Sequence, residues 1–171
     1  MRFLHNSAMG KGTMNILFFL KPKSDIAYIF DHFTLRQALE KIKNYGYTAI
    51  PVLDRTGKYV GTLREGDLLW AVINHRAIDS HDQEQYYVKD ILQGRPNTPV
   101  NVNASIEDLL LTAKNQNFVP VTDDRGCFIG IVTRRDILQY YYDKTHPAGT
   151  QRLNVKKRLK EDFAFSGVFS K

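Results

Sequence analysis

The sequence predicts an α/β (α+β) fold built from two copies of one strand-helix-strand-strand-helix unit. Three observations lead to this fold class: an internal repeat, a capped amphipathic helix before each copy of it, and a short apolar strand candidate before each helix. Residues 49–67 align without a gap with residues 118–136, at a constant offset of 69 positions. A repeat of this length indicates a duplicated unit rather than a solenoid period.

The two aligned stretches share the residues that make turns and strand ends. The identical pairs are Pro51 and Pro120, Val52 and Val121, Asp54 and Asp123, Gly57 and Gly126, Gly61 and Gly130, and Asp67 and Asp136. Each copy therefore predicts a short apolar strand, a turn that contains Asp and Gly, a second apolar strand and then a helix.

A helix is expected before each pair of strands. Residues 34–37 read as a capping box, and apolar side chains follow over residues 35–42 at i, i+3, i+4 and i+7. Residues 105–108 cap the second helix in the same manner. Short strand candidates precede both helices, at residues 26–30 and 100–102. The order of elements is thus the same in both halves.

The stretch 130–136 is a candidate anion site, because an apolar strand there runs directly into a helix. Thr133 stands at the N-cap position, and Asp136 lies three residues later, so the pair can cap the helix reciprocally. Arg134 and Arg135 add two charges beside the positive end of the helix dipole. The same residues also suit a plain capping box without a ligand, and the four residues alone do not decide between the two interpretations.

The chain resembles a tandem pair of cystathionine-β-synthase (CBS) domains, known as a Bateman module. The resemblance covers roughly residues 14–143, and its most specific parts are residues 46–54 and 130–136. It implies two repeats packed about a pseudo-twofold axis, with clefts between them that take adenosine-containing ligands. It also implies that the Asp of a Thr-x-x-Asp motif holds the ribose hydroxyls, while basic neighbours meet phosphate.

Carried onto this sequence, the resemblance predicts one good ligand site formed by both repeats. Its main-chain groups would read the adenine edge, and a tyrosine ring would stack on the base. The expected ligand-binding residues are Ala27, Tyr28, Tyr47, Thr48, Ile50, Pro51, Thr133, Arg134, Arg135 and Asp136.

A second site is expected to be weak, empty or differently liganded, because the first copy departs from the motif. Arg64 stands where the second copy has Thr133, and a guanidinium cannot accept a capping hydrogen bond. Gly66 replaces the second arginine. The residues of this weaker site would be Thr98, Pro99, Phe118, Val119, Arg64 and Asp67.

Composition favours a packed soluble protein in a reducing compartment. The single cysteine, Cys127, cannot form an internal disulfide, and we expect a cytoplasmic protein. A bacterial source is implied by the resemblance, because residues 46–54 with the Thr-Arg-Arg of residues 133–135 resemble the bacterial CBS pairs that bind cyclic di-AMP. The net charge of +6 forms no long stripe with interleaved aromatic residues, which makes nucleic-acid binding unlikely. The apolar run 16–20 is too short to span a membrane, and we expect it in the core of the first half.

The domain boundaries follow from these patterns. Residues 1–13 form an N-terminal extension that we expect to be disordered, residues 14–74 the first CBS repeat and residues 75–87 a solvated linker. Residues 88–143 form the second repeat, and residues 144–171 a basic tail.

The helices that follow the two motifs are rich in large apolar side chains. We expect core residues in both helices: Leu68, Leu69, Trp70 and Val72 in the first, and Ile137, Leu138, Tyr140 and Tyr141 in the second. The resemblance implies that these helices also form a homodimer face, and not all of Tyr140, Tyr141 and Tyr142 can turn inward on one helix.

The function most consistent with this pattern is a non-catalytic regulatory module. It would bind AMP, ADP, ATP or cyclic di-AMP and signal to an effector protein, with no cofactor and no metal. Asp25 falls near a position where a lysine often helps in the family, and an acid there would oppose phosphate. Two alternatives stay open: an interaction protein with degenerate, ligand-free clefts, and, less favoured, an enzyme acting on nucleotides. The sequence shows no nucleophile beside a base, no P-loop and no clustered His or Cys ligands.

Overall fold

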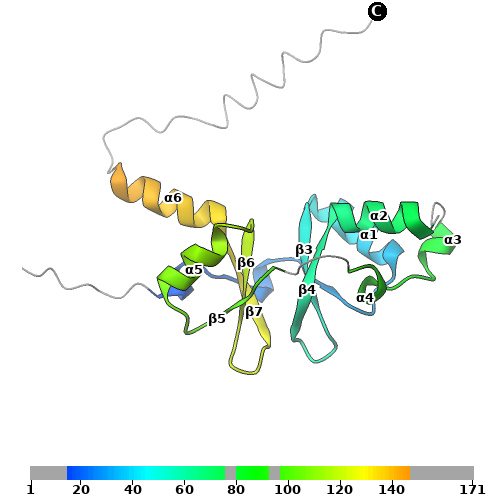
Figure 1. The fold of residues 1–171 in the computed structure, drawn as a ribbon, viewed down its shortest axis with the longest axis horizontal. Coiled ribbons are helices and arrows are strands. Elements are labelled where there is room, and N and C mark those ends of the chain that lie inside the picture. Colours follow the sequence, from blue (N-terminus) through cyan, green and yellow to red (C-terminus); the bar gives the residue numbers. More distant parts are fainter. Residues whose placement is uncertain (1–14, 76–79, 93–96, 147–171) are drawn as a thin grey trace, which may run out of the picture. The chain divides into compact units, whose positions relative to one another are not determined.

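A computed structural model describes residues 15–75, 80–92 and 97–146 (Figure 1). The expectations for residues 1–13 and for the tail beyond residue 146 lie outside this part of the chain. The chain forms two compact units, with the boundary between Ile137 and Leu138 inside the last helix. Both repeats belong to the first unit.

The elements occur in the predicted order, twice. The first half contains η1 (Ile16–Phe19), β1 (Lys21–Pro22), η2 (Lys23–Asp25), β2 (Ile29–Phe30), α1 (Leu35–Tyr45), β3 (Ala49–Leu53), β4 (Tyr59–Arg64) and α2 (Glu65–His75). The second contains α3 (Ser80–Gln83), α4 (Val88–Ile91), β5 (Val100–Asn101), α5 (Ile106–Ala113), β6 (Phe118–Thr122), β7 (Phe128–Thr133) and α6 (Arg134–Thr145). The predicted α/β class with two repeats is confirmed.

The two repeats have the same strand pairing. β2 is parallel to β3 and β3 is antiparallel to β4, while β5 is parallel to β6 and β6 is antiparallel to β7. Both hairpins have a register shift at the equivalent place, between Val52 and Leu53 and between Val121 and Thr122. Figure 1 shows the β3-β4 and β6-β7 turns at the same end of their sheets. The duplication in sequence is therefore a duplication in backbone geometry.

The helix starts are capped as predicted. Thr34 accepts a hydrogen bond from the Gln37 N–H, and the Gln37 side chain returns one to the Thr34 N–H, which completes the capping box of α1. Ser105 accepts from the Asp108 N–H at the start of α5. These bonds satisfy main-chain donors that the first turn of a helix leaves unpaired.

Each repeat begins with a segment that packs on the other repeat. β1 pairs with β7, with Lys21 opposite Ile131, and an added Cβ at Gly130 would lie 2.2 Å from the Lys21 carbonyl oxygen. Conversely, Val88 of α4 is buried in the core of the first repeat, and its N–H donates to the Phe33 carbonyl. Leu20 lies against Gly130. The prediction that residues 16–20 join the first core is therefore wrong for Leu20, because the β1-β7 pairing draws it to the second repeat.

The turns of the two hairpins bond to each other with pseudo-twofold symmetry. The Tyr59 N–H donates to the Gly126 carbonyl at 3.3 Å, and the Phe128 N–H donates to the Gly57 carbonyl at 2.9 Å. At the offset of 69 residues, Tyr59 corresponds to Phe128 and Gly57 to Gly126. Exchanging the two repeats therefore turns the first hydrogen bond into the second, as a pseudo-twofold axis requires. The rings of Tyr59 and Phe128 stack across this contact with centroids 6.2 Å apart.

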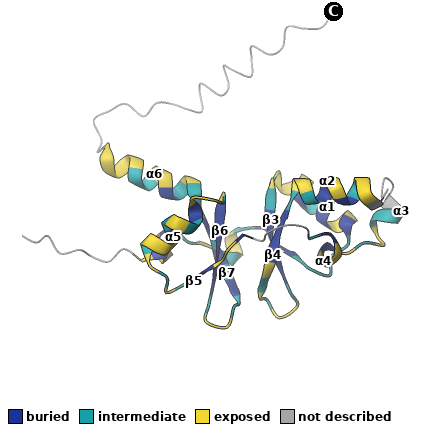
Figure 2. Cartoon of the chain, in the orientation of Figure 1, coloured by how far each residue is buried: buried dark blue, intermediate teal, exposed yellow. Residues whose placement is uncertain are grey.

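The α2 helix buries a narrower face than the sequence suggests. Its Leu68 and Ala71 are buried and its Val72 packs on the core, but Leu69, Trp70 and Ile73 are each more than half exposed. The prediction that Leu69 and Trp70 are core residues is wrong, because a helix on one face of a sheet can bury only one stripe. The same prediction is wrong for Leu138 of α6, which is more than half exposed, and is confirmed for Ile137, which is buried. Figure 2 shows the contrast between the buried strands and the exposed outer faces of α1, α2 and α5. Among the described residues, no helix is long and apolar enough to cross a membrane.

Candidate functional site

The junction of β7 and α6 is the best organised polar cluster of the predicted site. The Asp136 N–H donates to Thr133 Oγ1 at 3.1 Å, which makes Thr133 the helix cap. The Thr133 hydroxyl in turn donates to Asp136 Oδ2 at 2.5 Å. Strand β7 ends at Thr133 and α6 begins at the next residue, so the local sequence alone brings these two side chains together.

A lysine from the N-terminal segment completes this cluster. Lys21 Nζ lies 2.9 Å from Asp136 Oδ2, because β1 pairs with β7 directly before the motif. Partial burial by itself raises the pKa of the Asp136 carboxyl, but hydrogen bonds from Thr133 and Lys21, with the charges of Lys21 and Arg135, leave that pKa below its ordinary value. Asp136 is therefore an anion at neutral pH, with a lysine and a hydroxyl fixed beside it.

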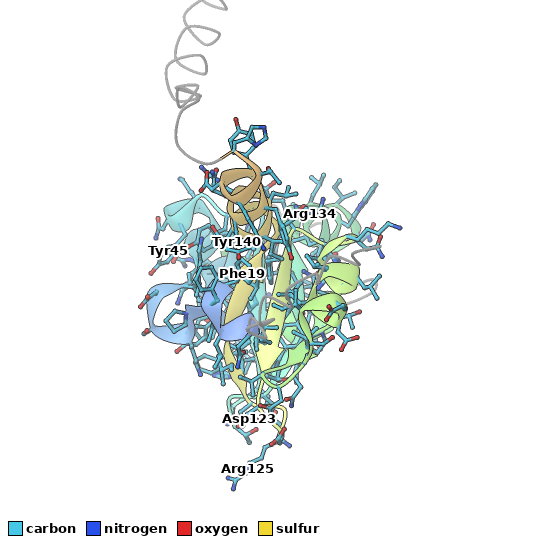
Figure 3. All side chains as sticks on the ribbon, turned by 90° about the vertical axis from the view of Figure 1, so that its left-hand side faces the viewer. Phe19, Tyr45, Asp123, Arg125, Arg134 and Tyr140 are labelled. Carbon is cyan, nitrogen blue, oxygen red and sulfur yellow. The ribbon has the colours of Figure 1, made fainter. Side chains whose placement is uncertain are left out.

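The two arginines of the motif have different surroundings. Arg134 Nε donates to the carbonyls of Ala113 at 3.0 Å and Gln116 at 3.1 Å, so it closes the C-terminal end of α5. Arg135 is exposed and adds its charge near Asp136. Figure 3 shows Arg134 at the end of the hairpin where α6 begins, far from Asp123 and Arg125 in the turn. The phosphate-binding role expected for both arginines stays a prediction, and the two side chains differ in that Arg134 Nε is already engaged within the protein.

The residues expected from the first repeat lie on β2 and β3 and just before them. Ala27, Ile50 and Pro51 are buried, and Thr48 is exposed with its carbonyl accepting from the Glu65 N–H. The half-buried Tyr28 ring has two ammonium groups over it, Lys23 Nζ at 4.8 Å from the centroid and Lys41 Nζ at 5.9 Å.

The contacts join some of the predicted site residues and not others. Thr133 and Asp136 are joined directly, and η2, which carries Lys23, packs against β7. Tyr47 instead lies beside Tyr45, with ring centroids 5.6 Å apart. Among the described residues, no hydrogen bond or ring contact joins Tyr47 or Thr48 to the β7-α6 junction.

Sequence reasoning missed Lys21 as a candidate site residue. The sequence instead suggested an acid, Asp25, near the ligand, yet Asp25 is exposed and accepts a hydrogen bond from Ser24. The available signal was a pair of lysines flanking Pro22, in a short segment without helical period. Only the β1-β7 pairing shows that this segment reaches the motif.

The predicted weaker site is crossed by hydrogen bonds within the protein. Arg64 Nη2 donates to Asn97 Oδ1 at 2.9 Å, and Asn97 Nδ2 donates to the Phe118 carbonyl at 3.0 Å. Asn97 is buried, with 6% of its surface exposed. The Tyr59 hydroxyl bonds Thr62 and donates to the Asn97 carbonyl, and burial raises the pKa of Tyr59 to about 12. Asp67 accepts from the Arg64 main-chain N–H at 2.9 Å.

Two more hydrogen bonds involve Thr98. Together with the bonds of Arg64 and Asn97 they form what is called the second cluster below. The Thr98 N–H donates to Gln116 Oε1 at 3.0 Å, and Gln116 Nε2 donates to the Thr98 carbonyl at 2.8 Å. One side-chain amide thus satisfies both main-chain groups of one residue. Neither Asn97 nor Gln116 was a predicted site residue, and their spacing in sequence carries no signal for this contact.

The chain belongs to the CBS domain family, whose model matches residues 19–74 and 88–143. This agrees with the duplicated strand and helix order and with the pseudo-twofold contact between the repeats.

Two relatives of similar length carry nucleotide names. The chain is 28% identical to cyclic di-AMP receptor B of Bacillus subtilis over 122 residues, which cover 71% of this chain and 82% of the relative. It superposes on the structure of CbpB of Listeria monocytogenes in complex with c-di-AMP with a TM-score of 0.66 at 26% identity, covering 77% of this chain and 97% of the other.

Other curated relatives are much longer enzymes. The chain is 32% identical to A-adding tRNA nucleotidyltransferase of Aquifex aeolicus over 109 residues. The matched region is 64% of this chain but 12% of that protein. The chain spans 21% of the length of two further curated relatives. The chain thus spans about a fifth or less of the length of these relatives.

Proposed function

We propose that this CBS pair is a regulatory module that binds an adenine nucleotide at the β7-α6 junction and passes the bound state to a partner protein. The observation that carries the proposal is the Asp136 carboxylate, held by Thr133 and Lys21 at 2.5 and 2.9 Å. A carboxylate fixed at the first turn of a helix can accept hydrogen bonds from two adjacent ribose hydroxyls. Charge-assisted bonds of this kind are stronger than those between neutral groups.

The cations around this carboxylate suit the phosphate of the same ligand. Lys21 and Arg135 come from β1 and α6, and the first main-chain N–H groups of α6 add the positive end of its dipole. In this proposal, Arg135 meets the phosphate, and Arg134 supports the site through α5. Of the two arginines, Arg135 is the more exposed and is the one proposed to meet a ligand from solution.

The base would lie against the first repeat. Tyr28 offers a half-buried ring, and Ala27 offers main-chain groups beside it. Tyr47, Thr48, Ile50 and Pro51 would complete this wall, as the family resemblance implies. Cyclic di-AMP is the favoured ligand, because receptor B and the CbpB complex are named for it. AMP, ADP and ATP present the same adenosine and are tested beside it.

The module is proposed to act as a homodimer through α2 and α6. Leu69 and Ile73 are exposed on α2, and their counterparts at an offset of 69, Leu138 and Tyr142, are exposed on α6. Two helices with the same exposed apolar positions suit a symmetric contact between copies, since such a contact uses the same surface on both. Light scattering of the wild type and of Leu69→Glu together with Ile73→Glu tests this: the wild type should be a dimer and the variant a monomer.

Ligand binding is tested by thermal shift of the full chain with a panel of cyclic di-AMP, AMP, ADP, ATP and GTP. A ligand at a hundred times its Kd adds roughly 2.7 kcal/mol to the free energy of unfolding. We expect a shift with at least one adenine nucleotide and none with GTP. A flat panel would instead favour the interaction protein with ligand-free clefts, and steady turnover of labelled ATP would favour an enzyme.

A further inference from the structure

In the second cluster, a glutamine side chain bonds the protein main chain in the way that an adenine base could. The Gln116 side chain accepts from the Thr98 N–H at 3.0 Å and donates to the Thr98 carbonyl at 2.8 Å. Both bonds are exposed to solvent, so the main-chain edge of Thr98 lies where a dissolved ligand can reach it. A carboxamide has one acceptor and one donor side by side.

Adenine has the same pair of groups on its Watson–Crick edge. Its N1 is an acceptor and its amino group is a donor, and proteins recognise this edge of an unstacked adenine through hydrogen bonds. A main-chain N–H and C=O that bind a carboxamide therefore also suit an adenine edge. Gln116 occupies the groups that an adenine would need at Thr98.

The first repeat lacks this contact. Ile29 of β2 pairs with Val52 as Val100 of β5 pairs with Val121, which places Ala27 at the position equivalent to Thr98. The offset of 69 places Tyr47 at the position of Gln116, and a tyrosine has no amide to offer. Among the described residues, no hydrogen bond engages the main-chain N–H or C=O of Ala27.

At the start of α2, the second cluster contains another hydrogen bond, between the side chains of Arg64 and Asn97. Arg64 is the cation at the start of α2, in the place that Thr133 has before α6, and its Nη2 donates to the buried Asn97 side chain. Asn97 is fixed in turn by its bond to the Phe118 carbonyl at 3.0 Å. In the second cluster, the main-chain groups that could bind adenine are thus engaged by Gln116, and the Arg64 side chain is engaged by Asn97.

We infer that Gln116 is a built-in substitute for adenine that keeps the second adenosine site closed, so that each chain holds an adenosine group at one of its two equivalent sites and not at both. This rests on the proposed function and specifies it, since it assigns the base to the first-repeat wall at Ala27 and Tyr28. It also predicts a latent second site with the same chemistry. Removing the Gln116 amide opens that site.

The test counts ligands on the full chain by native mass spectrometry, with AMP as the probe because it carries a single adenine. The variant is Gln116→Ala, which keeps the Gln116 carbonyl that Arg134 binds. The matched control is Gln139→Ala, which also removes an exposed amide hydrogen bond, to Asp143 at 2.8 Å within α6. We expect one AMP per chain in the wild type and the control, and two in Gln116→Ala.

A site-specific measurement accompanies the count. The Thr98 amide should exchange its hydrogen faster in Gln116→Ala than in the wild type, and AMP should restore its protection in the variant. Titration should show the second binding event in Gln116→Ala at least roughly tenfold tighter than any second event in the wild type, as two competing hydrogen bonds are removed.

The outcomes separate this inference from the proposed function. One AMP in both the wild type and a folded Gln116→Ala overturns the inference and leaves the proposed function standing. Two AMP in the wild type also overturns it. No AMP in the wild type but one in Gln116→Ala, with Thr98 protected, overturns the proposed first site and the expected count, and it supports only the closure of the second site by Gln116. No binding to either protein overturns both.

Discussion

The two strand-to-helix junctions of this protein contain the same aspartate and use it differently. Before α6, the Thr133 hydroxyl donates to Asp136 and Lys21 forms an ion pair with it. Before α2, Asp67 accepts the Arg64 main-chain N–H, and the Arg64 side chain turns to Asn97. A shared motif position therefore does not define a shared site. The residue before the helix and the segment that crosses from the other repeat decide what the carboxylate can bind.

The largest expected effect separates the two aspartates. Asp136→Ala removes the charged acceptor proposed for both ribose hydroxyls, which is worth about 3 kcal/mol or an affinity loss of roughly 100-fold. Asp67→Ala, the equivalent change in the other repeat, should alter affinity less than about threefold. Calorimetric titration with cyclic di-AMP and AMP measures both. Equal losses in the two variants would contradict the difference between the junctions.

The next comparison concerns the two equivalent glycines, Gly61 and Gly130. A Cβ at Gly130 would lie 2.2 Å from the Lys21 carbonyl oxygen, whereas at Gly61 it would meet Leu92 side-chain atoms at 3.5 and 3.6 Å, an ordinary contact. Gly130→Ala should therefore lower the free energy of unfolding by about 1–3 kcal/mol, because β1 must move. Gly61→Ala should change it by less than about 1 kcal/mol, a difference that urea unfolding can resolve.

A companion measurement shows whether the β1 position matters for the ligand. If β1 moves away from β7 in Gly130→Ala, Lys21 leaves Asp136, and affinity should fall in that variant and not in Gly61→Ala. Retained affinity in a destabilised Gly130→Ala protein would show that Lys21 is dispensable for binding.

The smallest expected effect separates the two arginines. Arg135→Ala removes an exposed charge and should weaken nucleotide affinity by about tenfold or less, with almost no change in thermal stability. Arg134→Ala leaves the Ala113 and Gln116 carbonyls without their shared donor and should lower the free energy of unfolding by about 1–3 kcal/mol. Thermal unfolding without and with ligand distinguishes the two effects. The reverse pattern would assign the phosphate to Arg134.

Local patterns in the sequence were sufficient wherever the interacting groups are close in the chain. The capping box of α1 spans three residues and forms as predicted. Thr133 also caps α6 as predicted, although Asp136 accepts from the Thr133 hydroxyl and not from its main-chain N–H. The two hairpins and their glycine turns also follow from the repeat, with Gly57 and Gly126 at positive φ of 84° and 80°. These features depend on backbone geometry that nearby residues determine.

Predictions were incomplete where a segment leaves its own repeat. Nothing in the run from Lys21 to Asp25 indicates pairing with a strand more than a hundred residues later, yet Lys21 reaches Asp136 by that route. The exposure of Leu69 and Trp70 was missed for a related reason, since apolar residues on a helix do not reveal how wide its buried face is. Arg134 was assigned to phosphate because its position in the motif carries no information about the end of α5.

By itself the sequence determined the duplicated unit, the order of its elements, the caps of its helices and the family, because each of these is written in spacing and local hydrogen bonding. The tertiary structure alone decided that β1 brings Lys21 to Asp136, that Arg134 serves α5, and that Gln116 and Asn97 occupy the second cluster. The physical reason is that side-chain hydrogen bonds act over about 3 Å in space, whatever the separation along the chain. Two repeats with the same backbone can therefore differ in what they are able to bind.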